Sequence, residues 1–153
     1  ASQAQIIENW ADTTLAKSIK IVFLEELTKN PILISSLFAN EISDSMQKLL
    51  LNIPTKIASQ ISGLINQKEK ESLKQNLEYL SNLIDQENFL IGEKLSIADI
   101  AVASHLSLLK FPNSSGETLK GKGCSLYIND PSLQNLFSWR DLIEDKLTIT
   151  NHN

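Results

Sequence analysis

The stretch from Asn88 to Phe111 constrains the fold more than any other, because it specifies where a helix starts and that the helix is buried. Ser96 is a good N-cap residue, and Asp99 follows three positions later, where its carboxylate can reach the Ser96 backbone N–H. Leu95 and Ile100 flank this cap as an apolar pair. The residues that follow are apolar on every side of a helical wheel: Ala101, Val102, Ala103, Leu106, Leu108, Leu109 and Phe111. Because such a helix is normally buried, we expect it to be the centre of a helical domain.

Helical periodicity extends over most of the remaining chain. The first helix is predicted from Ser2 to Thr28, and a short helix is predicted to begin at Pro31, a residue suited to the first helical position. Residues 42–65 carry another apolar stripe, interrupted at Pro54. The most regular pattern predicts a helix over residues 67–86. The last helix is predicted to begin at Asp130-Pro131, because aspartate is a good N-cap and proline suits the first turn.

These elements predict an all-α fold, a helical bundle in one domain that covers residues 1–147. Residues 148–153 are predicted to be a disordered tail. Residues 112–129 contain three glycines and are predicted to form a loop. A loop of that length is uncommon in a compact domain and is usually functional, packed on another element, or mobile.

The composition argues against some classes of binding partner and favours one kind of cellular compartment for the protein. The net charge is −4 and the lysines are scattered around a single arginine, so we expect no direct contact with nucleic acid. Cys124 is the one cysteine, which excludes an internal disulfide and favours a reducing compartment such as the cytoplasm. No apolar run approaches the roughly 18 residues that a membrane span needs.

The sequence offers few residues for catalysis, and we predict neither a catalytic residue nor a metal site. His105 lies within the central helix without nearby metal ligands, so a structural or partly exposed histidine is the favoured interpretation. Cys124 lies in the predicted loop close to Lys120 and Lys122, but a flexible loop rarely supplies the geometry by which a cation activates a thiol. The capping role of Ser96 and Asp99 accounts for both residues without chemistry.

A family resemblance rests on the pattern Phe89-Leu90-x-Gly92-x-x-Leu95-Ser96-x-Ala98-Asp99-Ile100. It resembles the central motif of the helical C-terminal domain of glutathione transferases, and a fainter likeness extends from Ile6 to Leu147. In that family the thiol-activating residue and most glutathione contacts belong to a thioredoxin-like N-terminal domain. The resemblance therefore implies a domain that is not catalytic by itself and needs no cofactor. Glutathione would bind only if a thioredoxin-like domain is supplied elsewhere.

The resemblance leaves two functions open. In the first, the chain is the electrophile-pocket and dimer half of a glutathione-transferase-like protein. In the second, it is a non-catalytic protein–protein interaction module, like those appended to some aminoacyl-tRNA synthetases and to an elongation factor subunit. Both imply a protein partner or self-association, and the first adds a small apolar electrophile as ligand.

A candidate contact surface lies on the first predicted helix. Ile6, Trp10, Ile21 and Leu24 fall outside the stripe that packs on the core, and several apolar residues aligned on one element suggest a contact site. The alternative is that another helix of the chain covers them, such as the last one with Trp139. By the resemblance, the matching helix borders both the substrate pocket and the dimer interface.

Overall fold

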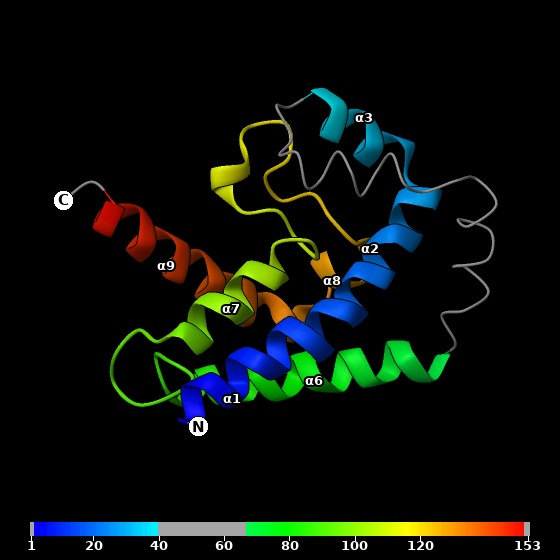
Figure 1. Ribbon diagram of the computed structural model, residues 1–153. Coiled ribbons are helices and arrows are strands. Elements are labelled where there is room, and N and C mark those ends of the chain that lie inside the picture. The colour runs from blue at the N-terminus through cyan, green and yellow to red at the C-terminus, as the bar shows by residue number, and fades with distance from the viewer. Residues whose placement is uncertain (1, 40–66, 152–153) are drawn as a thin grey trace.

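The computed structural model describes residues 2–39 and 67–151, and these residues form an all-α fold (Figure 1). The α-helices are α1 (Gln3–Trp10), α2 (Ala16–Lys29), α3 (Pro31–Ala39), α6 (Gln67–Gln86), α7 (Ile97–Leu106), α8 (Ser125–Ile128) and α9 (Gln134–Asn151). A π-helical turn, η1 (Ala11–Leu15), joins α1 to α2, and short 3₁₀ turns occur at η2 (Asn113–Ser115) and η3 (Pro131–Leu133). The predicted apolar stripe over residues 42–65 lies outside the described residues.

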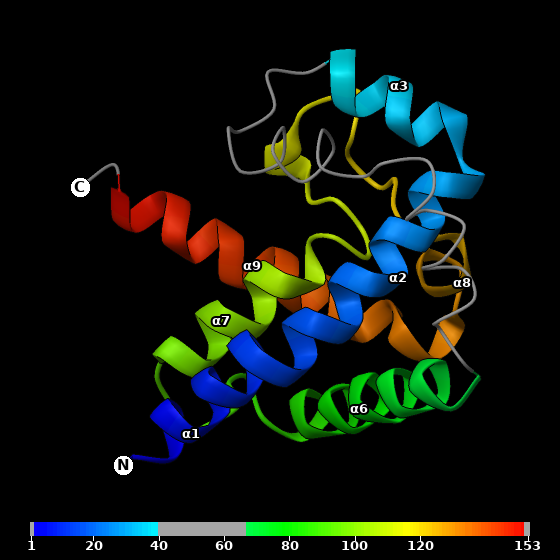
Figure 2. The same cartoon turned by 45° about the vertical axis from the view of Figure 1, so that its right-hand side comes forward.

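We call α1, η1 and α2 together the first helix. It contacts α7 through all three of its parts and α6 through α2, while α9 also contacts both α6 and α7. Figures 1 and 2 show the first helix running between α6 and α7, with α3 at its far end. Four long elements therefore enclose one core. None of the described helices is both long and apolar enough to cross a bilayer.

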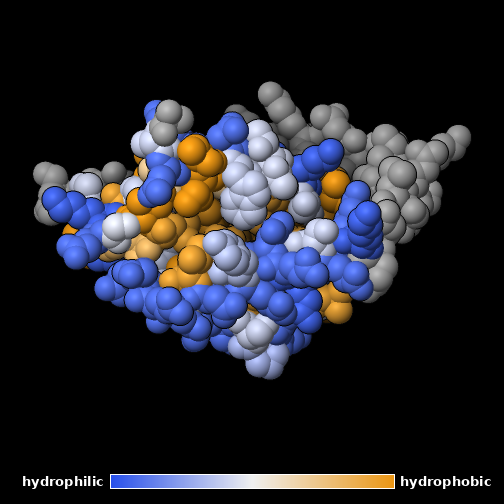
Figure 3. Space-filling view, turned by 90° about the horizontal axis from the view of Figure 1, so that it is seen from below, coloured by the Kyte–Doolittle hydropathy of each residue, from blue (hydrophilic) through white to orange (hydrophobic). Residues whose placement is uncertain are grey.

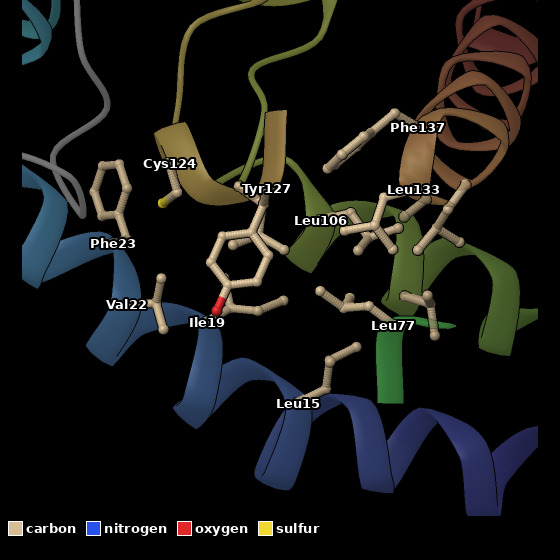
Figure 4. Packing of buried hydrophobic residues seen from close by; sticks show 14 of the residues in the cluster. Leu15, Ile19, Val22, Phe23, Leu77, Leu106, Cys124, Tyr127, Leu133 and Phe137 are labelled. Carbon is tan, nitrogen blue, oxygen red and sulfur yellow. The ribbon is translucent and has the colours of Figure 1, made fainter. Parts of the chain in front are cut away.

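The core is built from side chains that each of these elements contributes (Figure 4). Phe23 of α2 meets Phe111 edge-on, with ring centroids 6.1 Å apart. Other members of the cluster are fully buried, including Leu15, Ile19, Leu77, Leu106, Leu109 and Leu133. Burial of such side chains contributes about 1.5–3 kcal/mol each before chain entropy is counted, so this cluster is the main source of stability.

The π turn has its origin in the spacing of the apolar residues. Five of the buried residues of the first helix follow one another at intervals of four: Ala11, Leu15, Ile19, Phe23 and Leu27. An α-helix turns about 400° in four residues, so a strict four-residue repeat would drift by about 40° per step. The wider turn at η1, where the Ala16 N–H donates to the Ala11 carbonyl, absorbs part of that drift. It keeps both ends of the first helix facing the core.

The central helix α7 is shorter than predicted, because it ends at Leu106 instead of continuing to Phe111. The backbone leaves the helix to pair with the following loop: the Phe111 N–H donates to Lys122 O at 2.7 Å, and the Cys124 N–H donates to Leu109 O at 2.8 Å. Leu109 and Phe111 are buried in this segment, and Leu108 is half-buried. The inferred burial is therefore confirmed for Leu109 and Phe111, while its attribution to a helix was wrong.

Residues 112–129 are packed and partly regular. Lys110 and Gly123 form an isolated antiparallel bridge, and η2 and α8 lie within the segment. The Lys122 ammonium donates to the Ser36 hydroxyl at 2.7 Å, which connects the loop to α3. Of the behaviours that sequence left open for this loop, packing on another element is the one observed.

The C-terminal helix is longer than predicted. Helix α9 continues to Asn151, so residues 148–151 are helical and the prediction of a tail beginning at Thr148 is wrong. Leu147 packs against the core, and the hydroxyls of Thr148 and Thr150 donate to the carbonyls four residues earlier. Both hydroxyl groups therefore form hydrogen bonds within the helix. The polar composition of this segment did not indicate these bonds.

Candidate functional site

The predicted contact residues of the first helix do not share one environment. Ile6 is 59% exposed, whereas Trp10 and Leu24 are half-buried and pack against the core. Ile21 is half-buried at the side of a groove. The π turn lies between Trp10 and Ile21 and changes the rotation of the helix from one residue to the next. Residues that share a face on an ideal α-helical wheel therefore point in different directions before and after this turn. Trp139, the proposed cover, is buried in α9 and donates its indole N–H to Asn88 O at 2.9 Å.

The groove beside Ile21 runs between the first helix and the start of α6 and has a volume of about 560 Å³. Its walls are rich in hydroxyl and charged side chains: Thr13, Thr14, Lys17 and Ser18 on one side, and Lys68, Glu69 and Ser72 on the other. Tyr79 follows Ser72 by seven residues on the same face of α6 and is 64% exposed. This groove, together with Ile6 and Tyr79, forms what we call the contact surface.

The molecular surface on the α6 side is uneven in polarity. Seen from below, apolar side chains gather toward the left, and the remaining described surface is mostly hydrophilic (Figure 3). Isolated exposed apolar residues are normal on a soluble domain, whereas a gathered group is a feature of binding surfaces. The groove itself is lined mainly by hydroxyl and charged side chains, and Ile21 is the apolar residue among those that line it.

His105 is paired with an acidic residue of the π turn. Its Nε2 lies 2.7 Å from an Asp12 carboxylate oxygen, and the two side chains are 23% and 55% exposed. The pair connects α7 to η1, which fits the structural role expected for His105. Among the residues that the structure describes, His, Cys, Asp and Glu side chains form no group of three suited to a metal ion.

The Cys124 thiol is in an environment that suppresses ionisation. It is buried, and its Sγ contacts Leu108 O at 3.6 Å. Burial raises the pKa of the thiol well above its usual range, and the negative charges of Glu26 and Glu25 add to the effect. Since the thiolate is the nucleophile, burial and the raised pKa both disfavour Cys124 as a nucleophile.

Sequence reasoning missed a charged cluster beside that cysteine. Glu25 is 7% exposed, and its Oε1 accepts from Lys29 at 2.7 Å and from Lys70 of α6 at 3.1 Å. Burial opposes its ionisation, but the hydrogen bonds and charges of the two lysines prevail and lower the pKa of Glu25. The four-residue spacing of Glu25 and Lys29 was the available signal, whereas the contact with Lys70 depends on the fold.

Ser96 and Asp99 have the arrangement of a capping box at the start of α7. One Asp99 oxygen accepts from the Ser96 backbone N–H at 2.8 Å and from its hydroxyl at 2.7 Å. The Asp99 side chain is fully buried and also accepts from the Leu90 N–H, a bond that the sequence did not predict. Both residues thus make hydrogen bonds that fix the start of α7.

Comparison with known proteins now adds to this geometry. Residues 56–147 match the model of the family described as glutathione S-transferase, C-terminal domain. No curated protein and no solved structure matches the chain significantly. The match covers more than half of the chain and includes α6, α7 and most of α9, while the first helix precedes it. The chain therefore belongs to the glutathione S-transferase C-terminal domain family.

Proposed function

We propose that this domain supplies binding surfaces to a glutathione-transferase-like protein and carries out no catalysis by itself. Family membership gives the class of protein, and the resemblance assigns thiol activation to a different, thioredoxin-like domain. The observation that carries the proposal is the burial of Cys124, the one cysteine in the chain, because burial raises the pKa of its thiol and disfavours the thiolate. Glutathione is then a ligand only of the other domain, and a cytoplasmic location is part of the proposal.

The contact surface is the proposed meeting point with a second subunit or another protein. Ile6 is exposed at one end of the first helix, and Ile21 lines the groove toward the other end. Lys17 and Glu69 place charges of both signs in the same groove. Apolar contact surrounded by mixed charge is typical of protein interfaces, and the net charge of −4 argues against nucleic acid as the direct partner.

Catalysis is tested on the chain alone, with glutathione and 1-chloro-2,4-dinitrobenzene as a generic electrophile. We expect no conjugation above the uncatalysed rate and no retention on immobilised glutathione, because the preorganised donors that stabilise a thiolate are assigned to another domain. Turnover that a point mutation in this chain abolishes would overturn the proposal.

Self-association is tested by light scattering over a range of concentrations. We expect a dimer that Ile6→Asp weakens, because the substitution places a charge in an apolar contact. Ile32→Asp is the matched control, since Ile32 is 71% exposed and lies on α3, away from the contact surface. Equal effects of the two substitutions would exclude Ile6 from the interface.

The interaction-module function remains the second candidate. It predicts a stable complex with a heterologous protein and no need for a thioredoxin-like domain in the same polypeptide. Sequencing of the complete native transcript separates the two: an upstream thioredoxin-like pattern favours the transferase-like protein, and a different catalytic domain favours the appended module.

A further inference from the structure

The groove between the first helix and the start of α6 has a lining suited to a small polar ligand. Its volume of about 560 Å³ lies within the range of roughly 300–1,000 Å³ that small-molecule sites occupy. Apart from Ile21, its walls carry hydroxyl and charged side chains, and none of the described residues that line it is aromatic. A flat aromatic body would therefore find nothing to stack on, whereas a polar body meets polar groups on both sides.

Each wall of the groove carries a lysine and a hydroxyl group about one helical turn apart. On the first helix, Lys17 follows Thr13 by four residues, and on α6, Ser72 follows Lys68 by four residues. Residues with this spacing lie on the same face of a helix, so each lysine shares a wall with its hydroxyl neighbour. The groove therefore has a cation on each side.

The charge of the two lysines is available to a ligand. Within residues 2–39 and 67–151, no carboxylate forms an ion pair with Lys17 or Lys68, and both side chains are exposed. Glu69, the acidic residue of the lining, takes part in another interaction. Lys68 lies in the first turn of α6, where the positive end of the helix dipole adds to the attraction of an anion. The groove is thus locally positive on a chain whose net charge is −4.

The hydroxyl groups of the lining offer both acceptors and donors. Thr13 donates to Asn9 O at 2.7 Å and Ser18 donates to Thr14 O at 3.3 Å, so the oxygens of these two hydroxyls can still accept. The hydroxyls of Thr14 and Ser72 donate to no other residue that the structure describes, so they can donate to a ligand. Phosphate oxygens need donors, whereas sugar hydroxyls need donors and acceptors.

We propose that this groove binds the phosphomonoester of a sugar or another polyol, with the phosphate between Lys17 and Lys68 and the polyol on the hydroxyl groups of the walls. Lysine binds phosphate as a point charge, and a phosphate dianion can accept from two ammonium groups at once. A nucleotide is disfavoured, because its base would have no aromatic side chain on which to stack.

This inference goes beyond the proposed function, because it concerns a small ligand of the single chain. The groove is part of the contact surface, so a protein seated there would compete with the ligand. Binding is therefore measured at protein concentrations at which light scattering shows a monomer. Absence of ligand binding would then leave the prediction of a dimer at higher concentration untouched, and the two can fail separately.

The test titrates glucose 6-phosphate, glucose and inorganic phosphate into the full chain at one ionic strength, since salt screens exposed charges. Binding is followed by the backbone amide resonances in nitrogen–proton correlation spectra. We expect glucose 6-phosphate to shift the resonances of Thr14, Lys68 and Ser72 and to bind more tightly than inorganic phosphate. Glucose should produce no saturable shift, because it lacks the anion.

Variants at the two lysines separate recognition in the groove from general attraction of an anion to lysine. We expect Lys17→Gln and Lys68→Gln each to weaken glucose 6-phosphate by about five-fold, the upper end for an exposed ion pair, and the double variant to weaken it further. Lys17→Arg keeps the charge and should preserve binding. Lys20→Gln is the matched control, because Lys20 is exposed on the same helix and does not line the groove.

The proposal would be overturned by unshifted resonances at Thr14, Lys68 and Ser72. It would also be overturned if the double variant bound glucose 6-phosphate as tightly as wild type, or if Lys20→Gln weakened binding as much as Lys17→Gln. Equal binding of inorganic phosphate and glucose 6-phosphate would overturn the assignment of a polyol.

Discussion

The Asp99 carboxylate accepts a hydrogen bond from the Leu90 backbone N–H at 2.8 Å, across nine residues of chain. Its other oxygen receives the backbone N–H and hydroxyl of Ser96. One buried side chain therefore fixes both the first turn of α7 and the connection that leads into it. Asp99 should matter more to stability than a cap that serves only its own helix.

Substitution at the two capping positions should have unequal effects. Ser96→Ala should destabilise the domain by about 1 kcal/mol, the usual loss for a cap. Asp99→Ala should destabilise it by about 3 kcal/mol or more, because two backbone N–H groups lose their acceptor at roughly 1–3 kcal/mol each. Urea denaturation measures both, with exposed Ser104→Ala as the control in the same helix. Equal losses for Ser96→Ala and Asp99→Ala would contradict the bridging role of Asp99.

Two glycines of the packed loop should respond differently to alanine. A Cβ at Gly123 would lie 2.1 Å from Leu109 O, so Gly123→Ala forces the bridge between Lys110 and Gly123 apart. Gly121 has φ of 76° and open space around it, so Gly121→Ala should cost only about 1–2 kcal/mol of backbone strain. The melting temperatures of the two variants make the comparison. The prediction fails if Gly123→Ala melts no lower than Gly121→Ala.

The Cys124 thiol should resist modification in the native state. Its pKa is raised by burial, so at pH 8 the folded protein holds almost no thiolate. We expect reaction with 5,5′-dithiobis(2-nitrobenzoate) to be slow until denaturant is added and then to complete rapidly. A fast native reaction would show that Cys124 is accessible and ionised.

Acidic pH should remove the contribution of Glu25 to the stability of the folded domain. Its pKa is lowered below the ordinary value of 4.5, so its ion pairs with Lys29 and Lys70 stabilise the fold above that pH. This stability is lost as the pH falls through the folded pKa. Glu25→Gln should therefore destabilise the domain by about 1–2 kcal/mol at pH 7 and by less near pH 3. The exposed Glu71→Gln on α6 should show no such pH dependence, and a constant difference for Glu25→Gln would refute the ion-pair contribution.

The pair of His105 and Asp12 should be energetically coupled. A double-mutant cycle with His105→Gln and Asp12→Asn should give a coupling energy of about 0.5–1 kcal/mol, as for a partly exposed pair of polar side chains in contact. Strict additivity of the two substitutions would mean that the contact is incidental.

Local signals predicted much of the fold. Helix α6 has its predicted limits, residues 67–86, because its apolar stripe and charged outer face agree with each other. Pro31 begins α3 as expected for a residue with fixed φ. The residue at which α7 ends could not be predicted from neighbouring residues. Leu109 and Phe111 pair through their backbones with Cys124 and Lys122, which follow later in the sequence.

The candidate surface was harder to predict than the fold. Ile6 and Trp10 were assigned to one face by α-helical spacing, and the π turn that follows them changes that spacing for Ile21 and Leu24. Similarly, Phe89 and Lys146 are far apart in sequence and meet only when α9 crosses the connection after α6. Side-chain pairs of this kind depend on tertiary packing, which periodicity does not encode.

The π turn also makes the first helix tolerant of a change in chain length at one place. A π turn contains one residue more than the α-helical turn it replaces, so deleting Thr13 or Thr14, both exposed, would restore ordinary helical geometry. The core-facing sides of α1 and α2 would stay in register. A deletion elsewhere in the same helix would rotate everything beyond it by about 100° relative to the core. Length variants of this domain should therefore be viable when the missing residue comes from η1.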